Sequence, residues 1–311
     1  MESRFIYEQA PFPSCHASSI AETSPGKFLC TWFGGTNEGA KDVGIWLSSW
    51  DGGDWSLPVQ VAADPEEPCW NPVLHQMRSG ETILFYKAGP RPSNWSGLLK
   101  RSTDGGKTWS KEEWLPAGIL GPIKNNPIEL ENGELICGSS VESYRLWSCW
   151  AEVSPDAGRT WTKYGPIGVP GKPYGIIQPG VADLGGGRVL FLSRSRGMGR
   201  IVASTSEDAG RTWSDAVLTD LPNPNSGIDA TILADGRVAL IYNHTEAART
   251  PLNVAVSSDE GVTWSDPVTL EDEPGEYSYP AIIQAADGAI HMTYTWRRER
   301  VKHVVMSPDE V

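Results

Sequence analysis

The sequence lacks the features that mark zinc sites, membrane spans and nucleic-acid binding. Its five cysteines are an odd number without C-x-x-C spacing, which excludes the usual zinc motif and predicts mostly reduced core residues. No apolar run reaches the roughly 18 residues that a membrane-spanning helix requires. The formal net charge of −13 at pH 7 disfavours nucleic acid and anionic membranes as partners, because phosphate binding requires a basic face. Neutral or acidic sugars stay open as ligands, and no metal or cofactor is implied.

The chain also has little that would divide it into domains. No stretch resembles a flexible linker or a low-complexity tract, so residues 1–311 are predicted to form one domain. The start, Met1–Arg4, carries no basic-then-apolar signal pattern, which predicts a cytoplasmic protein, or a secreted or periplasmic one if a leader has been removed. Glycine (33 residues) and proline (24 residues) are abundant and supply the turns of an all-β chain.

A motif of the form Ser-x-Asp-x-Gly-x-Thr-Trp, here called an Asp box, occurs four times. The boxes begin at Ser102, Ser154, Ser206 and Ser257, and a near-copy without the Thr spans residues 49–55. Recurrence at about 50 residues fits four short strands with their turns, the blade of a β-propeller. One active site has no use for five copies of a ligand, so each box is interpreted as a turn. In that turn Asp caps backbone N–H groups, Gly takes a positive φ and Trp packs beneath.

A second pattern lies between the boxes, where a polar residue precedes Pro or Ala and then apolar residues. It recurs six times, which predicts an all-β fold, a six-bladed β-propeller with Asp-box turns. Because the first strand of each blade lines the central channel, the six polar residues are expected to form a ring at one mouth. The tail 300–306 alternates like a strand and residues 5–7 offer another, so both chain ends are predicted to share the closing blade. The ring positions are His16, Asn71, Asn126, Gln178, Asp229 and Tyr279.

With these boxes and repeats, nearly the whole chain resembles the sialidase (neuraminidase) superfamily of six-bladed propellers. The resemblance implies three arginines that hold a substrate carboxylate, a Tyr nucleophile assisted by a Glu, and an Asp acid/base on a loop of blade one. Tyr279, nine residues before Gly288, resembles the nucleophile in its setting. Arg194 and Arg249 resemble the arginines of blades four and five.

The chain departs from the family pattern at three places. The segment 14–18, Ser-Cys-His-Ala-Ser, stands where the first arginine is expected. Gln178 stands where the family has the Glu that assists the Tyr, and Gln cannot accept a proton. The loop 34–42 offers both Glu38 and Asp42 as the acid/base, without a unique match.

The ring supplies candidate replacements for the missing Glu. After closure of the propeller, Tyr279 is expected to lie between Asp229 and His16, and either group could accept the phenol proton. His16 is also suited to general acid/base catalysis near neutral pH.

Two enzyme mechanisms fit these residues. In a retaining exo-glycosidase, Tyr279 attacks the anomeric carbon of a terminal acidic sugar, Glu38 or Asp42 protonates the leaving oxygen, and arginines clamp the carboxylate. In a polysaccharide lyase, a Tyr/His pair removes the proton α to a uronic acid carboxylate while arginine or Asn neutralises the enolate. A glycan-binding propeller without catalysis is the third hypothesis.

Several polar and aromatic residues are candidates for binding rather than chemistry. Asn71, Asn126 and Gln178 are expected to bond substrate hydroxyls or channel water. Trp95, in an exposed-looking loop, is the candidate platform for a sugar face.

The remaining basic residues leave alternatives open. At strand spacing Arg196 shares a face with Arg194, so either can be the substrate clamp. Arg297 and Arg298 are interpreted as a solvated turn before the last strand. His244 is the remaining histidine placed nearest the mouth.

Overall fold

The computed structural model describes residues 1–172 and 175–311, which are almost entirely β-structure. Apart from two short 3₁₀-helices, every regular element in these ranges is a β-strand, and the strands form six four-stranded sheets. Each sheet is one blade, so the predicted all-β, six-bladed propeller class is confirmed. No helix of the described chain is long and apolar enough to cross a membrane.

The chain divides into two compact units. The first comprises residues 1–121 and 279–310, and the second comprises residues 122–278 with Val311. The prediction of a single domain over residues 1–311 stays a prediction.

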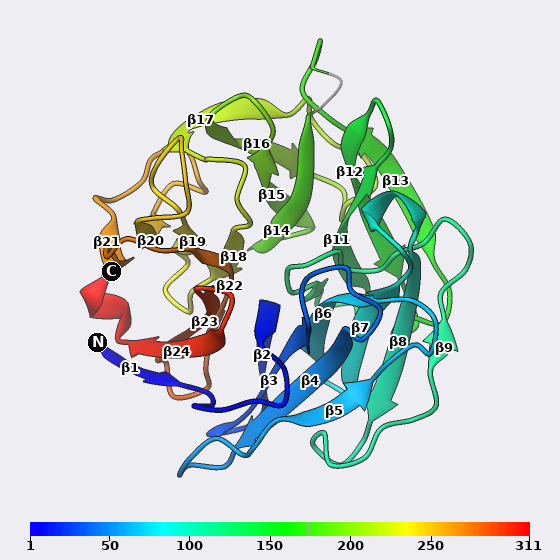
Figure 1. The fold of residues 1–311 in the computed structure, drawn as a ribbon. Coiled ribbons are helices and arrows are strands. Elements are labelled where there is room, and N and C mark those ends of the chain that lie inside the picture. Colours follow the sequence, from blue (N-terminus) through cyan, green and yellow to red (C-terminus); the bar gives the residue numbers. More distant parts are fainter. Residues whose placement is uncertain (173–174) are drawn as a thin grey trace. The chain divides into compact units, whose positions relative to one another are not determined.

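The first unit holds blades one, two and six. Their strand orders are β2-β3-β4-β5, β6-β7-β8-β9 and β22-β23-β24-β1 (Figure 1). The elements are β1 (Glu2–Phe5), β2 (Ser14–Ser24), β3 (Lys27–Gly35), β4 (Gly44–Trp50), β5 (Val59–Ala62), β6 (Cys69–Gln76), β7 (Thr82–Ala88), η1 (Pro92–Asn94), β8 (Ser96–Ser102), β9 (Glu113–Trp114), β22 (Tyr277–Gln284), β23 (Ile290–Trp296), β24 (Arg300–Met306) and η2 (Pro308–Glu310).

Strand β1 completes the sixth blade from the other end of the chain. It runs antiparallel beside β24, with Phe5 opposite Lys302 (Figure 1). Both chain ends therefore share a blade, as predicted, and the tail strand has the expected bounds. The N-terminal strand ends at Phe5 rather than covering residues 5–7. The N–H of Ile6 still donates to the carbonyl oxygen of Val301 at 2.9 Å, and Ile6 and Tyr7 are buried in the core.

The second unit holds blades three, four and five, each in simple sequence order. Its strands are β10 (Ile128–Glu129), β11 (Leu135–Glu142), β12 (Trp147–Ser154), β13 (Thr162–Ile167), β14 (Ile176–Gly185), β15 (Arg188–Ser195), β16 (Arg200–Ser206), β17 (Val217–Pro222), β18 (Asp229–Ile232), β19 (Val238–Tyr242), β20 (Leu252–Ser257) and β21 (Val268–Glu271).

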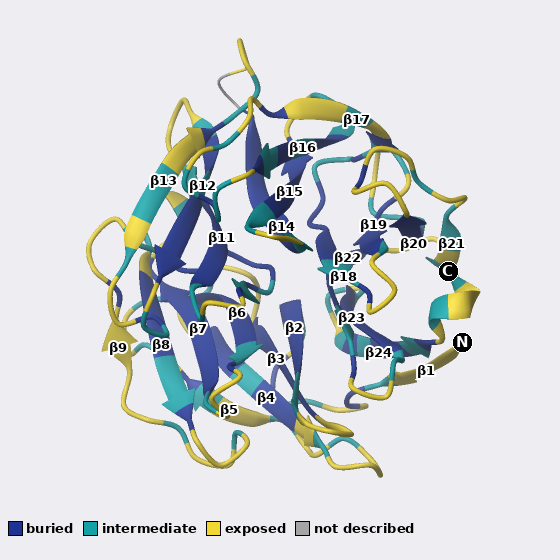
Figure 2. Ribbon diagram, turned by 180° about the vertical axis from the view of Figure 1, so that it is seen from behind, coloured by how far each residue is buried: buried dark blue, intermediate teal, exposed yellow. Residues whose placement is uncertain are grey.

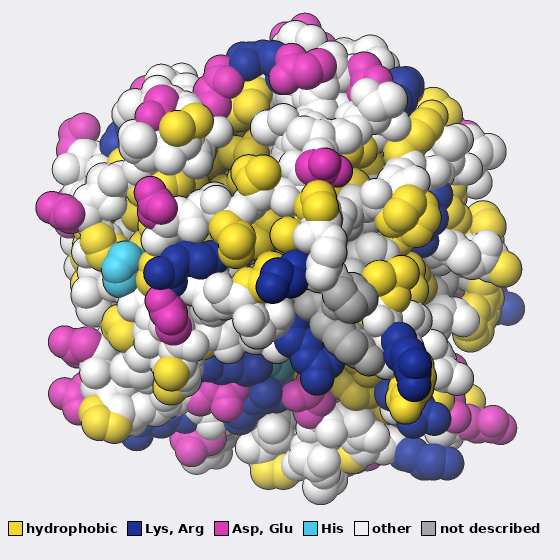
Figure 3. Space-filling view, turned by 90° about the horizontal axis from the view of Figure 1, so that it is seen from above, with side chains coloured by type: hydrophobic (Ala, Val, Ile, Leu, Met, Phe, Trp, Pro, Cys, Tyr) yellow, Lys and Arg dark blue, Asp and Glu magenta, His cyan; other side chains and the backbone are white. Residues whose placement is uncertain are grey.

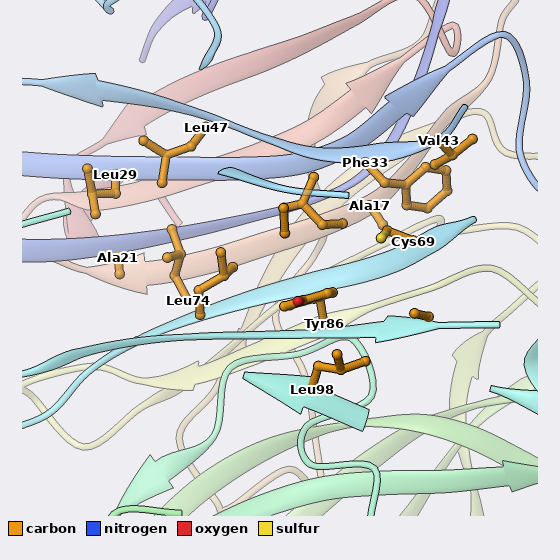
Figure 4. Packing of buried hydrophobic residues seen from close by; sticks show 14 of the residues in the cluster. Ala17, Ala21, Leu29, Phe33, Val43, Leu47, Cys69, Leu74, Tyr86 and Leu98 are labelled. Atoms are coloured by element: carbon orange, nitrogen blue, oxygen red, sulfur yellow. The ribbon is translucent and has the colours of Figure 1, made fainter. Parts of the chain in front are cut away.

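Burial within a blade falls from the first strands to the last. Figure 2 shows β2, β7 and β14 as buried, whereas outer strands such as β13 and β17 are largely intermediate or exposed. In the first unit, side chains of β2, β3, β6 and β7 interlock, among them Ala17, Phe33, Leu74 and Tyr86 (Figure 4). All five cysteines are buried and free, as expected for reduced core residues.

The Asp boxes are turns, as the sequence predicted. In blade two, Oδ1 of Asp104 accepts the N–H of Thr108 at 2.9 Å, and Oδ2 accepts its hydroxyl at 2.6 Å. Oγ of Ser102 donates to Asp104 and accepts the N–H of Gly106, whose φ is +84°. The Thr108 hydroxyl and N–H are the main reason why the pKa of Asp104 falls to about 2.

The other boxes repeat this geometry and add one feature. The pKa of Asp208 and that of Asp259 also fall to about 2, with the Thr at the same box position as the main cause. The residue after the Asp is left-handed in these boxes as well, although it is not Gly: Ala157, Ala209 and Glu260 have φ of +56°, +58° and +62°.

The boxes of blades two and five pack on the preceding blade of their own unit. A Cβ on Gly106 would come within 2.4 Å of Leu29 in β3, and a Cβ on Gly261 within 2.9 Å of Leu190 in β15. Glycine is thus required both for the positive φ and for the close approach between neighbouring blades.

A bulge in the first strands corrects the predicted ring. In β2, β6 and β14, the residue pairs 17–18, 71–72 and 178–179 each lie opposite a single residue of the next strand. The first residue of each pair is left-handed, with φ of +59°, +38° and +55°, and Tyr279 in β22 has φ of +51°. Ala17 therefore occupies the position of Asn71, and His16 lies one residue earlier. The polar-then-Pro/Ala pattern, interpreted as the start of each first strand, falls on this bulge but is misaligned by one residue in blade one.

The two remaining ring residues lie outside this bulge. Asp229 begins β18 in regular register opposite Ile241, and Asn126 lies two residues before β10. Neither is among the left-handed residues of the described chain. The prediction of six equivalent positions is therefore wrong: three blades share the bulge, and blade six shares its left-handed residue.

Candidate functional site

In the first unit, His16 and Tyr279 form an aromatic pair. Their ring centroids are 4.1 Å apart with planes at 43°, and both residues are buried. Nδ1 of His16 lies 3.1 Å from Oγ1 of Thr295, which also accepts the N–H of Ala17 at 3.1 Å. Strand β23 thus fixes the imidazole against the phenol, and two predicted catalytic residues lie in contact.

Tyr279 is held in an unfavourable backbone conformation. A left-handed φ is costly for an aromatic residue, and Pro280 restricts the residue before it further. Such conformations cost on the order of 1–3 kcal/mol and persist only where the surroundings enforce them, commonly at functional sites.

The two carboxylates of the blade-one loop have different partners. Oδ2 of Asp42 accepts the N–H of Thr36 at 3.0 Å and its hydroxyl at 2.7 Å, which closes the loop on itself. Oε2 of Glu38 accepts a bond from Nη1 of Arg298 at 2.5 Å. Asp42 therefore has a structural role in the loop. Glu38 is the better candidate of the two to give up its bond to Arg298 and contact a ligand.

Trp95 lies against a second indole rather than alone in its loop. Its ring is 6.0 Å from that of Trp70 at 70°, and Nε1 of Trp70 donates to the carbonyl oxygen of Gly89 at 2.7 Å. Asn71 follows Trp70 directly and is buried. Trp95 and Asn71 are thus joined through Trp70.

In the second unit, Arg194 is the centre of a buried polar cluster. Its Nη1 donates to Oε1 of Gln178 at 3.1 Å, and its Nε donates to Oδ1 of Asn225 at 3.0 Å. Its Nη2 also donates to the backbone oxygen of Asn225, a residue with φ of +60°. These acceptors are neutral, so Gln178 orients the guanidinium without cancelling its charge.

Lys124 belongs to the same cluster and is almost fully buried, with 1% of its surface exposed. Burial lowers the pKa of Lys124 to about 8; Asp229 acts in the opposite direction, and Arg194 lowers the pKa further. Asp229, also buried, thus serves as a counter-charge to Lys124 in the second unit.

Arg249 is engaged by a carboxylate. Its Nη1 donates to Oε1 of Glu276 at 2.7 Å and to Oγ of Ser278 at 3.3 Å, and Ser278 in turn donates to Glu276 at 3.1 Å. Of the two predicted arginine clamps, Arg249 has an acidic partner, whereas the described partners of Arg194 above are neutral.

The structure separates Arg196 from Arg194. Strand β15 ends at Ser195, and Arg196 lies beyond it, with its guanidinium 4.8 Å from the ring centroid of Trp147. Arg196 was a candidate clamp because it was expected to share a strand face with Arg194, but the strand does not extend to it. Arg194 is therefore the buried clamp candidate.

Two other candidates lie at the edges of the second unit. His244 is exposed, and its Nδ1 lies 2.6 Å from the hydroxyl of the buried Tyr242. Asn126 is only partly buried, next to the buried Asn125, whose amide donates to the backbone oxygen of Gln178 at 2.9 Å.

The surface in Figure 3 shows no separation of charge, and the described residues form no metal-ligating group. On the face in Figure 3, acidic and basic side chains are interspersed rather than separated. No group of three or more His, Cys, Asp or Glu suited to a metal ion occurs among residues 1–172 and 175–311.

Sequence reasoning missed four residues of these clusters: Lys124, Asn225, Glu276 and Arg298. Lys124 lies two residues before Asn126, and Glu276 three before Tyr279, so proximity to ring residues was the available signal. Arg298 was interpreted as a solvated turn; its ion pair with Glu38 depends on contacts that no repeat encodes.

Comparisons with known proteins agree on the class. A family model described as "BNR repeat-like domain" matches residues 26–292. A sialidase of Micromonospora viridifaciens is 28% identical over 283 residues, covering 78% of this chain and 41% of the relative. A sialidase of Bacteroides fragilis is 26% identical over 221 residues, covering 63% of this chain and 39% of the relative. The chain thus spans about two fifths of the length of these relatives.

Two solved structures show the same fold at low identity. A Dyadobacter fermentans protein of unknown function superimposes with a TM-score of 0.84 at 19% identity, covering 98% of this chain and 97% of its own. The NanB sialidase of Streptococcus pneumoniae gives 0.83 at 14% identity, covering 99% and 71%.

The six blades, the Asp boxes and these superpositions define a six-bladed β-propeller of the sialidase type. The chain belongs to the BNR repeat-like domain family and is a divergent, sialidase-like member of it.

Proposed function

We propose that this protein is a carbohydrate-active enzyme that hydrolyses a terminal, carboxylate-bearing sugar from a glycan. The observation that carries the proposal is the pair of buried cations in the second unit, Lys124 and Arg194.

The charges of the buried cluster support this proposal. A buried cation is costly unless an anion compensates it, and Asp229 is the anion that acts on Lys124. The described partners of Arg194 are the neutral Gln178 and Asn225. The planar guanidinium fork of Arg194 has the geometry that binds a carboxylate, and Lys124 adds a second positive charge to the same buried cluster.

The chemistry is assigned to the pair in the first unit. Tyr279 attacks the anomeric carbon, its phenol proton passes to His16, and an acid protonates the departing glycosidic oxygen. Water then hydrolyses the bond between the Tyr279 oxygen and the sugar. Glu38 is the preferred acid, because Asp42 is engaged by Thr36.

A β-elimination is the second candidate, favoured by the direct contact between the rings of His16 and Tyr279. In that reaction a base removes the proton α to a uronic acid carboxylate, a cation stabilises the enolate, and the leaving oxygen takes a proton.

A substrate screen separates these functions. Sialosides, other ulosonic acid glycosides and uronic acid oligosaccharides would be assayed for reducing-sugar release and for the ultraviolet absorbance of an unsaturated uronate. Sugar release without the absorbance supports hydrolysis, and release with it supports elimination. Binding without turnover of any acidic glycan would contradict both and leave a glycan-binding propeller.

A further inference from the structure

The turn between β23 and β24 has an unusual backbone for its sequence. Its two central residues, Arg297 and Arg298, have φ of +53° and +63°, and the N–H of Glu299 donates to the carbonyl oxygen of Trp296 at 3.0 Å. This is the φ pattern of a type I′ turn, which normally carries Asn or Gly. Two arginines there store strain, so their side chains are expected to have a task.

The two arginines point to different partners. The guanidinium of Arg297 lies 4.5 Å from the ring centroid of its neighbour Trp296. Arg298 reaches across to Glu38, and its carbonyl oxygen accepts the N–H of Cys15 at 2.8 Å. Arg298 is thereby tied both to the blade-one loop and to the residue before His16.

The loop that carries Glu38 is held at three points. Asp42 closes it on Thr36, Arg298 holds Glu38, and Gly39 lies so close to Trp70 that a Cβ would come within 3.3 Å of the indole. The loop, which belongs to blade one, therefore contacts both blade six and blade two within the first unit.

The loop emerges beside the catalytic pair. Strand β3 ends at Gly35 opposite Ser14, and two residues earlier Phe33 lies opposite His16. The ring of His16 also contacts Phe33 at 5.7 Å. Glu38 thus sits on the connection that leaves β3 at the His16 end of the blade.

We propose that Arg298 is a positioning residue that fixes the Glu38 loop beside the His16–Tyr279 pair. The chemical role given to Glu38 rests on the proposed function, whereas the holding of the loop does not. Arg298 acts through Glu38, so its loss lowers turnover without abolishing substrate binding.

The first test needs no substrate. Hydrogen exchange would be followed at the amides of Thr36, Ala40 and Val43, which are bonded within the loop. Arg298→Ala should accelerate exchange there about two- to fivefold, the range that a partly exposed ion pair gives. Arg297→Ala, with the same backbone change one residue away, is the matched control and should leave these amides unchanged. Equal exchange in the two variants would overturn the proposal.

The second test applies to turnover. With a substrate from the screen, Arg298→Ala should lower kcat about tenfold with KM nearly unchanged, and Arg298→Lys should restore most of it. The charge swap Glu38→Arg with Arg298→Glu should restore slow exchange of the loop but not turnover. Recovery of turnover in the swap would show that Glu38 is no acid, whereas absence of turnover in the unaltered protein would contradict only the proposed function.

Discussion

Two regions of the chain use the same strained backbone but differ in the side chains that occupy it. In the Asp boxes the left-handed position recurs together with the Ser, Asp and Thr around it. In the first strands the left-handed position also recurs, but the residue changes from Ala17 to Asn71, Gln178 and Tyr279. Where backbone and side chains repeat together, the repeat serves the fold. Where only the backbone repeats, the side chains are available for chemistry.

The largest effect is expected at Tyr279. Tyr279→Phe keeps the ring and the left-handed backbone but removes the hydroxyl, so kcat should fall by at least about 100-fold. The midpoint of thermal unfolding should stay unchanged. Tyr86→Phe, in the core of the same unit, is the control and should leave kcat unaltered. If the Tyr279 variant and the unaltered protein had equal kcat, the left-handed position of the first strands would serve the fold alone, as it does in the Asp boxes.

A pH dependence is expected from Lys124. Below its pKa of about 8 the ammonium is charged and attracts a carboxylate; above it the charge is lost. The affinity for an acidic sugar should therefore fall about tenfold as the pH rises from 7 to 9.5, a modest value for a buried charge pair. The Lys124→Arg variant stays charged over this range, so its affinity for the sugar, measured by calorimetric titration, should change less with pH. An unaltered slope in the variant would exclude Lys124 from the anion site.

A box carboxylate should affect stability and not turnover. Asp208→Ala removes bonds to Ser206, Arg211 and Thr212, which predicts a loss of about 1–2 kcal/mol in the free energy of unfolding. Asp51→Ala, in the box that lacks the Thr, should cost less. Chemical denaturation measures both, and a drop in kcat for Asp208→Ala would count against the structural role.

The same carboxylates predict how stability changes in acid. Their folded pKa of about 2 lies below the ordinary value of 3.8, so unfolded chains bind more protons between the two. The stabilisation is complete above pH 3.8 and is lost as the pH falls toward 2. Asp208→Asn should flatten that part of the denaturation profile, and an unchanged profile would contradict the assignment.

The smallest effect is expected from relieving strain alone. Ala209→Gly should stabilise the protein by a few tenths to about 1 kcal/mol, since Gly adopts the left-handed region freely. Gln178→Gly relieves the same strain but removes the bond to Arg194, so it should weaken binding of an acidic sugar. If both glycine variants bind equally well, Gln178 has no role in orienting Arg194.

The fold was readable from the sequence because its signals repeat. Asp boxes and strand starts recur at fixed spacing, and turn chemistry assigns each a local structure. The alignment of blade one failed because Ala17 has neither the polar side chain nor the following proline of its equivalents. Repetition locates the start of each first strand, but the residue that begins the bulge is decided by pairing with the next strand.

The site was readable only in part, for a related reason. Tyr279, His16 and Gln178 were found because they stand at repeated strand starts, and Arg194 was found because its segment resembles one of the sialidase family. Lys124 and Arg298 were not, because their roles depend on burial and on partners distant in sequence. Chemistry that occurs once in a chain leaves no periodic signal.

The pairing of β1 with β24 has a consequence for how the chain matures. The first unit is built from residues 1–121 and 279–310, whereas the second is nearly continuous. At ribosomal speed, the segment that carries His16 waits roughly 10–50 s for the segment that carries Tyr279. During that interval the chain can hold a completed second unit while the His16–Tyr279 pair does not yet exist. The His16–Tyr279 pair can therefore form only after blade six has been synthesised.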